Sequence, residues 1–150
     1  RLAQRSVFAT QMVVTSDLGL RHDVHPPYKR PVGERLAQSM LRHTYVRSTS
    51  PVSPEVGQQS SVKDDRVELD LREAQGLHGS DGQPLRGFEI AGADELFYPA
   101  TVQLDAEGKV QLRSSEVAKP CYVRYGWQPF PTCNVVNAAG LPLGTFRIRL

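Results

Sequence analysis

Cysteine is scarce in this chain, whose 150 residues include only Cys121 and Cys133. Two cysteines do not make the disulfide framework that stabilises many small secreted domains. They could pair with each other or could be two buried thiols, and the sequence leaves both possibilities open. They do not indicate a metal site, because zinc sites normally need closely spaced cysteine pairs and further ligands.

Long apolar runs and runs of a single charge are also missing. No apolar stretch approaches the ~20 residues that a membrane-spanning helix needs. The 18 Lys and Arg residues are interspersed with 16 Asp and Glu residues. This mixture gives no electrostatic footprint for nucleic acid or for an anionic membrane surface. With 39% apolar residues, the composition is close to that of an average globular domain and allows a core of fair size.

The sequence begins without an initiator methionine. Its first residues, Arg1-Leu2-Ala3-Gln4-Arg5, do not form the apolar stretch of a signal peptide. We therefore expect a cut inside a longer chain, with any targeting signal upstream of it. For this reason the residues themselves do not indicate a compartment.

The first part of the chain, 1–46, is expected to form a strand, a loop and a helix. The run Met12-Val13-Val14 within 7–15 is typical of a buried strand. After a polar loop, apolar side chains recur at helical spacing over 28–43, which predicts an amphipathic helix. Because proline is tolerated only in the first helical turn, Pro31 places the helix start near Arg30. The apolar face comprises Val32, Leu36, Ala37, Met40 and Leu41.

The remainder of the chain is predicted to be β structure. Residues 47–65 are rich in Ser, Pro, Gln and Val and indicate an extended connector. In 66–150, short stretches alternate between apolar and polar residues and are separated by turn residues. Short strands at this spacing favour a sandwich-like accessory β segment. The predicted strands are 67–71, 88–90, 101–104, 110–113 and 122–125, the third and fourth joined as a hairpin.

The polar loop between the expected strand and helix contains Asp17, His22, Asp23 and His25. In α/β folds, functional residues sit at the C-terminal ends of strands. A histidine in this loop could act as general base for a serine nucleophile, with a nearby carboxylate fixing its tautomer. Two other interpretations are a solvated loop without a role and a metal site. Ligands as close together as His22, Asp23 and His25 rarely surround one ion without help from elsewhere.

Several short motifs follow one another in a characteristic order. Their ordered series, rather than any single motif, resembles the C-terminal signature of sialate O-acetylesterases, a family of SGNH-type hydrolases. The resemblance covers nearly the whole chain except the Ser- and Pro-rich connector, and it places 1–4 in the helix before the last strand of the hydrolase. The motifs include Asp17-Leu18-Gly19, Asp23-Val24-His25-Pro26, Val32-Gly33, Arg35-Leu36-Ala37, Gly87-Phe88-Glu89-Ile90, Phe97-Tyr98-Pro99-Ala100 and Arg124-Tyr125-Gly126-Trp127.

This resemblance implies an α/β fold, made of the C-terminal piece of an SGNH-type, flavodoxin-like hydrolase layer followed by an antiparallel β-sandwich-like segment. It implies hydrolysis of O-acetyl esters of sialic acids without a cofactor or a metal, in a lysosomal or secreted protein. It assigns the catalytic base to His25 and the orienting carboxylate to Asp23. Many SGNH hydrolases have the acid three residues before the histidine, whereas Asp23 is two residues before it. Asp17 or an upstream acid could therefore orient His25 instead.

The nucleophilic serine of that family belongs to an N-terminal Gly-Gln-Ser-Asn-type block, and this sequence has no such block. We therefore expect an upstream segment or a partner subunit to carry the serine, and we expect the chain alone to be inactive. Two alternatives are a related acetylesterase acting on xylan or another polysaccharide, and a non-catalytic carbohydrate-binding β module. Arg124, Tyr125 and Trp127 suit a sugar platform, although packing within the β layer explains them more simply.

Overall fold

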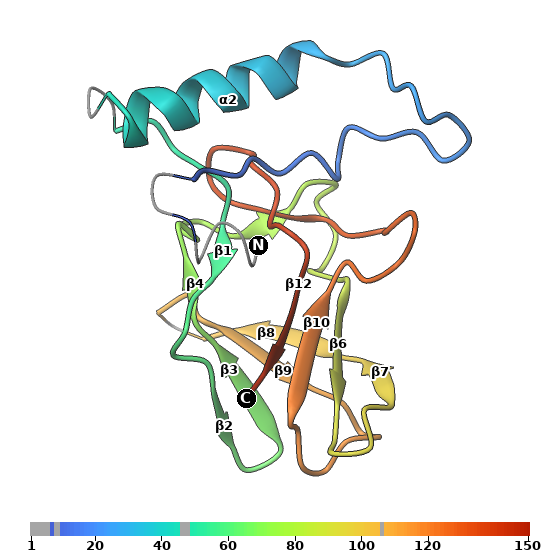
Figure 1. Cartoon of the computed structure of the whole chain (residues 1–150). Helices are drawn as coiled ribbons and strands as arrows, with labels where there is room; N and C mark the ends of the chain where they lie inside the picture. Colours follow the sequence, from blue (N-terminus) through green and yellow to red (C-terminus); the bar gives the residue numbers. More distant parts are fainter. Residues whose placement is uncertain (1–6, 8–9, 46–48, 106) are drawn as a thin grey trace.

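The computed structural model describes residues 7, 10–45, 49–105 and 107–150. In this part of the chain the helix α2 (Arg30–His43) lies across one end of a body of short β-strands (Figure 1). No helix of the described residues is long and apolar enough to cross a membrane. The strands are β1 (Glu55–Val56), β2 (Ser61–Lys63), β3 (Arg66–Leu69), β4 (Leu71–Arg72), β5 (His78–Gly79), β6 (Phe88–Ala91), β7 (Phe97–Pro99), β8 (Thr101–Leu104), β9 (Val110–Arg113), β10 (Tyr122–Tyr125), β11 (Val135–Val136) and β12 (Phe146–Arg149).

Two four-stranded antiparallel sheets make up most of the β body. One has the strand order β2-β3-β9-β8 and the other has the order β12-β10-β6-β7. Inward-facing residues of both sheets belong to one hydrophobic core, which is the arrangement of a β-sandwich. Two shorter pairs, β1 with β4 and β5 with β11, complete the body. Figure 1 shows β1 and β4 on the side of the body that faces α2.

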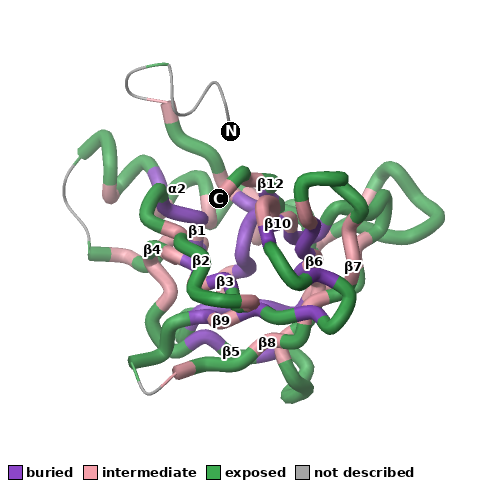
Figure 2. Tube along the Cα trace, turned by 90° about the horizontal axis from the view of Figure 1, so that it is seen from below, coloured by how far each residue is buried: buried purple, intermediate pink, exposed green. Residues whose placement is uncertain are grey.

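Alternation of side chains along each strand explains how the sheets bury one face. In β10, Val123 and Tyr125 are buried, whereas Arg124 between them is only half-buried. Phe88, Tyr125 and Phe146 are cross-strand neighbours, and the ring centroids of the first two are 4.6 Å apart. Burial of each such side chain stabilises the fold by about 1.5–3 kcal/mol. Figure 2 shows the buried residues gathered between the sheets and the exposed ones on the connecting loops.

Four of the five predicted strands are confirmed, as β6, β8, β9 and β10, and β8 forms the predicted hairpin with β9. The fifth, 67–71, is divided at Asp70 into β3 and β4. At that residue the backbone N–H donates to Ser60 Oγ over 3.1 Å, and the carboxylate accepts the N–H of Gln59 over 3.0 Å. These bonds turn Asp70 toward the segment 57–60, so the ladder of β3 ends one residue earlier.

The range 47–65, predicted to be a connector, contains both β1 and β2. β2 pairs with β3 at the edge of a large sheet, with Val62 opposite Val67. The end of this range therefore contributes a strand to the sandwich. The division of the chain into parts at 1–46, 47–65 and 66–150 stays a prediction.

The α/β fold expected from the sequence is wrong. The described residues form antiparallel, sandwich-like sheets and one helix, not a flavodoxin-like layer of parallel strands. Among the described residues of 7–15 no strand forms, and Met12 is 39% exposed although Val14 is buried. An apolar run becomes a strand only where a neighbouring strand pairs with its backbone N–H and C=O groups. No strand of the described residues pairs with this run in that way. The helix expected to include 1–4 lies outside the described residues.

The predicted helix is confirmed as α2, but its polar side faces the β body. The Arg35 side chain is 11% exposed and Ser39 is 5% exposed. By contrast, Leu36, Met40 and Leu41 are 49%, 48% and 43% exposed. These three residues, called the apolar stripe of α2 below, are therefore not covered by the described part of the chain.

Candidate functional site

The four candidate residues lie on a loop, 17–27, which we call the histidine loop. It leaves the β body and leads into α2 (Figure 1). A turn begins it, in which the N–H of Leu18 donates to the carbonyl oxygen of Thr15 over 3.1 Å. A single antiparallel bridge between Leu20 and Asp23 closes its tip. All residues in 19–25 are exposed, so the loop presents its side chains to the surroundings.

Asp17 holds the base of the histidine loop to α2. Its two carboxylate oxygens accept hydrogen bonds of 2.7 and 2.6 Å from the two terminal nitrogens of Arg35. Arg35 also donates to the carbonyl oxygen of Val14 over 2.7 Å. Such a bidentate pair fixes geometry as well as charge. Asp17 therefore anchors the loop, and it would have to leave Arg35 before it could orient His25.

His25 and Asp23 are close together, but the carboxylate does not bind the imidazole ring. Asp23 Oδ1 accepts the backbone N–H of His25 over 2.7 Å, and the same oxygen is 3.7 Å from His25 Nδ1. The second distance exceeds that of a hydrogen bond. The His25 side chain is 88% exposed. Asp23 thus fixes the main chain at His25, while the ring is free to meet a group from outside the described residues.

His22 is exposed on the same loop and has no ion pair among those found in the described part of the chain. The metal interpretation of this loop finds no support in its geometry. Within the described ranges, no three His, Cys, Asp or Glu side chains gather closely enough to hold a metal ion. His25 and His22 are both exposed histidines of this loop. Of the two, only His25 has its backbone N–H bound by a carboxylate, that of Asp23, among the described hydrogen bonds.

A second loop, 127–132, contacts the histidine loop, and we call it the aromatic loop. It contains Trp127, which is 48% exposed, and Phe130, which is 37% exposed. The guanidinium of Arg21 lies over the Phe130 ring, 4.8 Å from its centroid. A cation over an aromatic face contributes about 0.5–1 kcal/mol at an exposed site. The two loops therefore meet at one edge of the molecule.

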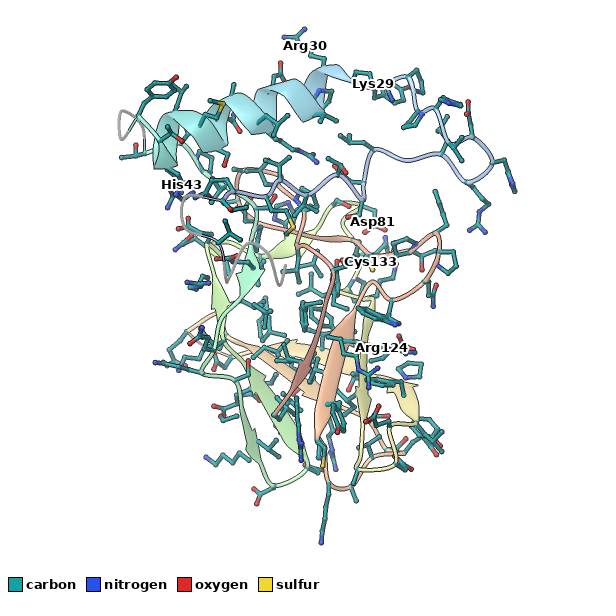
Figure 3. The ribbon with its side chains drawn as sticks, viewed as in Figure 1. Lys29, Arg30, His43, Asp81, Arg124 and Cys133 are labelled. Atoms are coloured by element: carbon teal, nitrogen blue, oxygen red, sulfur yellow. The ribbon has the colours of Figure 1, made fainter. Side chains whose placement is uncertain are left out.

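A charged cluster ties the aromatic loop to the β body. Arg86 donates to Asp81 Oδ2 over 2.6 Å and to the carbonyl oxygen of Thr132 over 2.9 Å. Asn134, which is buried, donates to Asp81 Oδ1 over 2.9 Å. Arg86, followed by Asn134, holds the pKa of the Asp81 carboxyl well below its ordinary value. Figure 3 shows Asp81 at the end of the β body that faces α2.

The two cysteines are free thiols at opposite ends of β10. Cys121 directly precedes β10, and Cys133 Sγ lies 3.4 Å from where a Cβ of Gly126 would be. Five extended residues span about 17 Å at ~3.3 Å each, whereas a disulfide needs Cα atoms within about 7 Å. The fold therefore keeps the pair apart. Burial also raises the pKa of the Cys133 thiol, which disfavours its reactive thiolate.

Of the three residues suited to a sugar platform, two are packed into the β layer. Tyr125 is 2% exposed, and its hydroxyl accepts the backbone N–H of Val135 over 3.2 Å. Arg124 pairs with Glu89 across the sheet, over 2.8 Å. Trp127 differs from both because about half of it is exposed, so packing does not account for its position.

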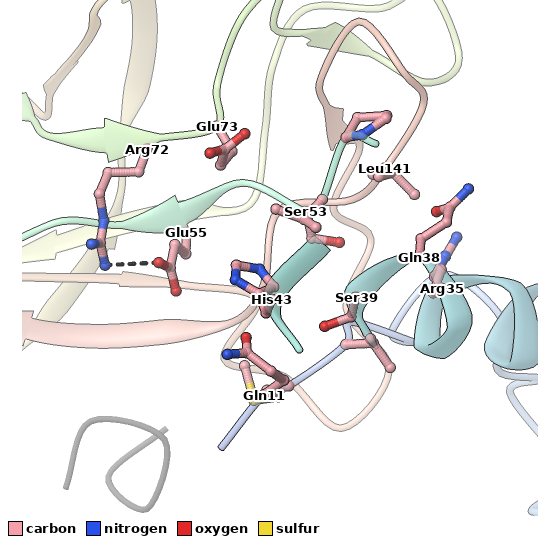
Figure 4. A pocket seen from close by; sticks show the side chains of 14 residues that line it. Gln11, Arg35, Gln38, Ser39, His43, Ser53, Glu55, Arg72, Glu73 and Leu141 are labelled. Atoms are coloured by element: carbon pink, nitrogen blue, oxygen red, sulfur yellow. Dashed lines mark ion pairs between the residues drawn. The ribbon is translucent and has the colours of Figure 1, made fainter. Parts of the chain in front are cut away.

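A hollow of about 220 Å³ lies between α2 and the β body (Figure 4). Ser39 and His43 of α2 line it together with Ser53 and Glu55. These residue types are those of a catalytic triad, but their contacts are not. The Glu55 carboxylate pairs with Arg72 over 2.7 Å. It is therefore engaged with an arginine and not with His43.

The sequence analysis missed the residues that position the two loops. Arg35 is separated from Asp17 by 18 residues, and Arg21 is more than 100 residues before Phe130. No periodic pattern connects such distant residues. Phe130 did carry a signal, because it lies between Pro129 and Pro131 shortly after the only tryptophan of the sequence. Aromatic residues in a proline-rich loop indicate an exposed surface rather than a strand.

Comparisons with known proteins connect this chain to solved structures. No protein-family model matches the sequence, and a search of curated proteins finds no match. Among solved structures, the chain is similar to a carbohydrate acetylesterase from Xanthomonas citri, with 38% sequence identity and a TM-score of 0.80. The similarity covers 88% of this chain and 31% of that chain, so this chain spans about a third of its neighbour's length.

Proposed function

We propose that this chain is part of a carbohydrate O-acetylesterase and that His25 is the general base of its active site. The observation that carries the proposal is the 38% identity with the carbohydrate acetylesterase from Xanthomonas citri over 88% of the chain. Because that neighbour is about three times as long, the complete catalytic site would include residues beyond those described here. An upstream segment or a partner subunit would supply the nucleophilic serine.

In this mechanism His25 moves a proton in each of two steps. It takes the proton of the serine hydroxyl while the serine oxygen attacks the acetyl carbonyl carbon, and it then gives that proton to the departing sugar oxygen. A water molecule next loses a proton to His25 and attacks the acetyl-serine; the bond to the serine oxygen breaks, acetate leaves, and His25 returns the proton to the serine oxygen. Its 88% exposed side chain leaves His25 accessible to a serine from another part of the protein.

Asp23 would position His25 through the main chain. Its carboxylate accepts the His25 backbone N–H over 2.7 Å, which fixes where the imidazole leaves the loop. The role of orienting the ring nitrogen, implied by the family resemblance, would require the 3.7 Å separation from Nδ1 to shorten when the serine-bearing part is present. Either role makes Asp23 a positioning residue.

The apolar stripe of α2 supports the need for a further part of the protein. Leu36, Met40 and Leu41 are between 43% and 49% exposed, although helical apolar stripes normally face a core. The opposite side of α2 is already occupied, because Arg35 donates to the carbonyl oxygen of Val14 and Arg42 donates to Glu73 of the β body. We propose that the part carrying the serine covers this stripe, which would bring its nucleophile to the same end of the molecule as the histidine loop.

Two substrate classes fit this function. Sialic acids follow from the resemblance to sialate O-acetylesterases, and a neutral acetylated polysaccharide is the second candidate. The solved neighbour is a carbohydrate acetylesterase, which is compatible with both classes.

The test replaces His25 by Ala in protein that includes the serine-carrying part. The readout is acetate released from O-acetylated sialic acid and from acetylated xylan, with circular dichroism as the control for folding. Loss of a triad histidine costs about 10⁶-fold in turnover in a comparable hydrolase, and we expect a loss of at least about 10³-fold here. His22→Ala is the matched control, since His22 is an exposed histidine three residues earlier in the same loop, and it should retain most activity. Near wild-type turnover of a folded His25→Ala protein would contradict the mechanism.

Asp23 is tested in the same assay. Asparagine keeps an oxygen that can accept the His25 N–H, so Asp23→Asn should retain most turnover if Asp23 acts through the main chain. If its charge orients the imidazole, the loss should approach about 10⁴-fold. Asp23→Ala removes both roles and should lose activity in either case.

A further inference from the structure

A groove of about 170 Å³ lies beside Trp127, between the aromatic loop and the sheet that contains β6 and β10. We call it the aromatic groove. Its lining comes from four separate parts of the chain, which are 86–89, Pro99, 126–128 and 131–133. It is distinct from the hollow under α2, with which it shares no lining residue.

The floor of the aromatic groove is formed by two glycines. Gly87 and Gly126 have φ values of 105° and 64°, and the N–H of Gly126 donates to the carbonyl oxygen of Gly87 over 3.1 Å. A Cβ on Gly87 would lie 2.4 Å from Cys133 Sγ, and one on Gly126 would lie 2.9 Å from Thr145 Cγ2. Both positions therefore require glycine. The missing side chains let Cys133 and Thr145 pack against the backbone at these two positions.

One wall of the groove is Trp127, the only tryptophan in the sequence. It is 48% exposed, although no strand or helix of the described part requires a large ring at this position. Aromatic rings present an apolar face to which the C–H groups of a sugar ring can pack, and tryptophan adds an N–H donor at its edge. An exposed indole beside a groove of this size is suited to holding one sugar ring.

The charged groups of the groove are already paired. Arg86 binds Asp81 and the carbonyl oxygen of Thr132, over 2.6 and 2.9 Å. Glu89 accepts two hydrogen bonds from Arg124, at 2.8 and 3.0 Å. Recognition of a carboxylate needs an available guanidinium or ammonium group. The aromatic groove offers none, because its single arginine is neutralised by Asp81, and its remaining polar lining includes the neutral amide of Gln128.

From these features we infer that the aromatic groove is a subsite for an uncharged sugar residue of a glycan, stacked on Trp127. The contact of Arg21 with Phe130 sets the aromatic loop against the histidine loop. A glycan chain held in the groove would therefore run toward the loop that carries His25. The position of the bound sugar relative to the cleaved acetyl ester rests on the proposed function, whereas the binding of a neutral sugar in the groove does not.

In the chain by itself, Trp127 reports on binding, because it is the only tryptophan of this sequence. Its fluorescence is titrated with xylohexaose, cellohexaose and mannohexaose as neutral probes, and with N-acetylneuraminic acid as the acidic one. We expect a saturable spectral change with at least one neutral hexasaccharide and at least about tenfold weaker binding of the sialic acid. The inference is overturned by the absence of saturation with all three neutral sugars, or by tighter binding of the sialic acid.

Variants locate the site by calorimetry, which does not depend on the indole. Trp127→Ala should weaken binding of the best neutral sugar by about tenfold or more, since it removes the aromatic face on which the sugar ring packs. Trp127→Phe keeps an aromatic face and should lose less. Leu96→Ala, at an exposed apolar residue outside the groove, is the control. Wild-type affinity in a folded Trp127→Ala protein would refute the assignment.

The outcomes separate this inference from the proposed function. Normal sugar binding together with a silent His25→Ala substitution would leave a sugar-binding protein without the proposed base. Loss of acetate release in His25→Ala, together with wild-type sugar affinity in Trp127→Ala, would support His25 as the base. It would refute the aromatic groove as a sugar subsite.

Discussion

The spacing between Asp23 and His25 decides what the carboxylate can reach. A short polar side chain two residues before an N–H forms a local turn with it, and Asp23 does so over 2.7 Å. The sequence predicted a loop with these residue types, and their catalytic role stays a prediction. The contacts of Asp17 were not predictable, because its partner Arg35 comes from α2. His25 can act as a general base only if a serine nucleophile lies next to it, and no motif in this sequence indicates that serine.

Asp81 gives a pH-dependent prediction at the scale of one residue. Hydrogen bonds from Arg86 and Asn134 lower its pKa in the folded chain, so the unfolded chain binds more protons just below the ordinary value of 3.8. Stability from this group is therefore fully present above about pH 5, and it is lost progressively as the pH falls below that value. Asp81→Asn should lower the thermal midpoint near neutral pH, and its difference from the wild type should shrink toward about pH 2.

Thermal unfolding followed by circular dichroism at several pH values measures this difference. Asp64→Asn is the control, because Asp64 is an exposed aspartate whose φ of 57° asparagine also tolerates. A difference between wild type and Asp81→Asn that stays constant from neutral to acidic pH would show that the charge of Asp81 contributes nothing.

At the scale of elements, alternation predicted the strands that have one buried face. β6, β9 and β10 alternate because one side of each lies in the core between the sheets. β12 has the same pattern, with Phe146 buried and Arg147 exposed, and it was equally predictable. β1, β5 and β11 are two residues long, which is too short for any period to appear. Their positions follow from pairing with distant segments.

Helical periodicity predicted α2 but not which of its sides faces the β body. We expect the double substitution Leu36→Glu and Met40→Glu to change the free energy of unfolding of this chain by no more than about 0.5 kcal/mol, as exposed positions do. It should reduce self-association, because two exposed apolar side chains become charged. In protein that includes the serine-carrying part, the same change should weaken the association of the two parts.

Chemical unfolding and analytical ultracentrifugation provide the two readouts for α2. Arg42→Ala is the comparison on the covered side of the helix, where Arg42 donates to Glu73 Oε2 over 3.1 Å. If the double substitution lowered the free energy of unfolding as much as a core substitution does, the apolar stripe would have to be covered by other residues of this chain.

At the scale of the whole molecule, the family resemblance indicated a chemistry but misjudged the fold. A flavodoxin-like layer needs several parallel strands joined by helices. The described residues contain one helix and antiparallel pairs, because the turn-separated alternating stretches dominate the chain after residue 54. The motifs of the resemblance extend into this β body, at β6 and β10, where they build the core and the aromatic groove. These motifs therefore indicated residues of the core and of the groove, but they did not indicate that the residues lie in antiparallel sheets.

The last prediction concerns the chain by itself. Its core lies between two complete sheets, so it should unfold cooperatively, yet it should release no acetate from acetylated sugars. The sequence has no Gly-Gln-Ser-Asn-type block, and Ser39, the serine of α2, is only 5% exposed. Addition of the serine-carrying part should restore release, and His25→Ala should prevent that restoration.

The measurement is acetate release by the chain alone and after reassembly, with a light-scattering mass for each sample. A monomer of this chain that hydrolyses acetyl esters, and loses that activity in His25→Ala, would place the nucleophile within these 150 residues and would contradict the proposed division of the active site.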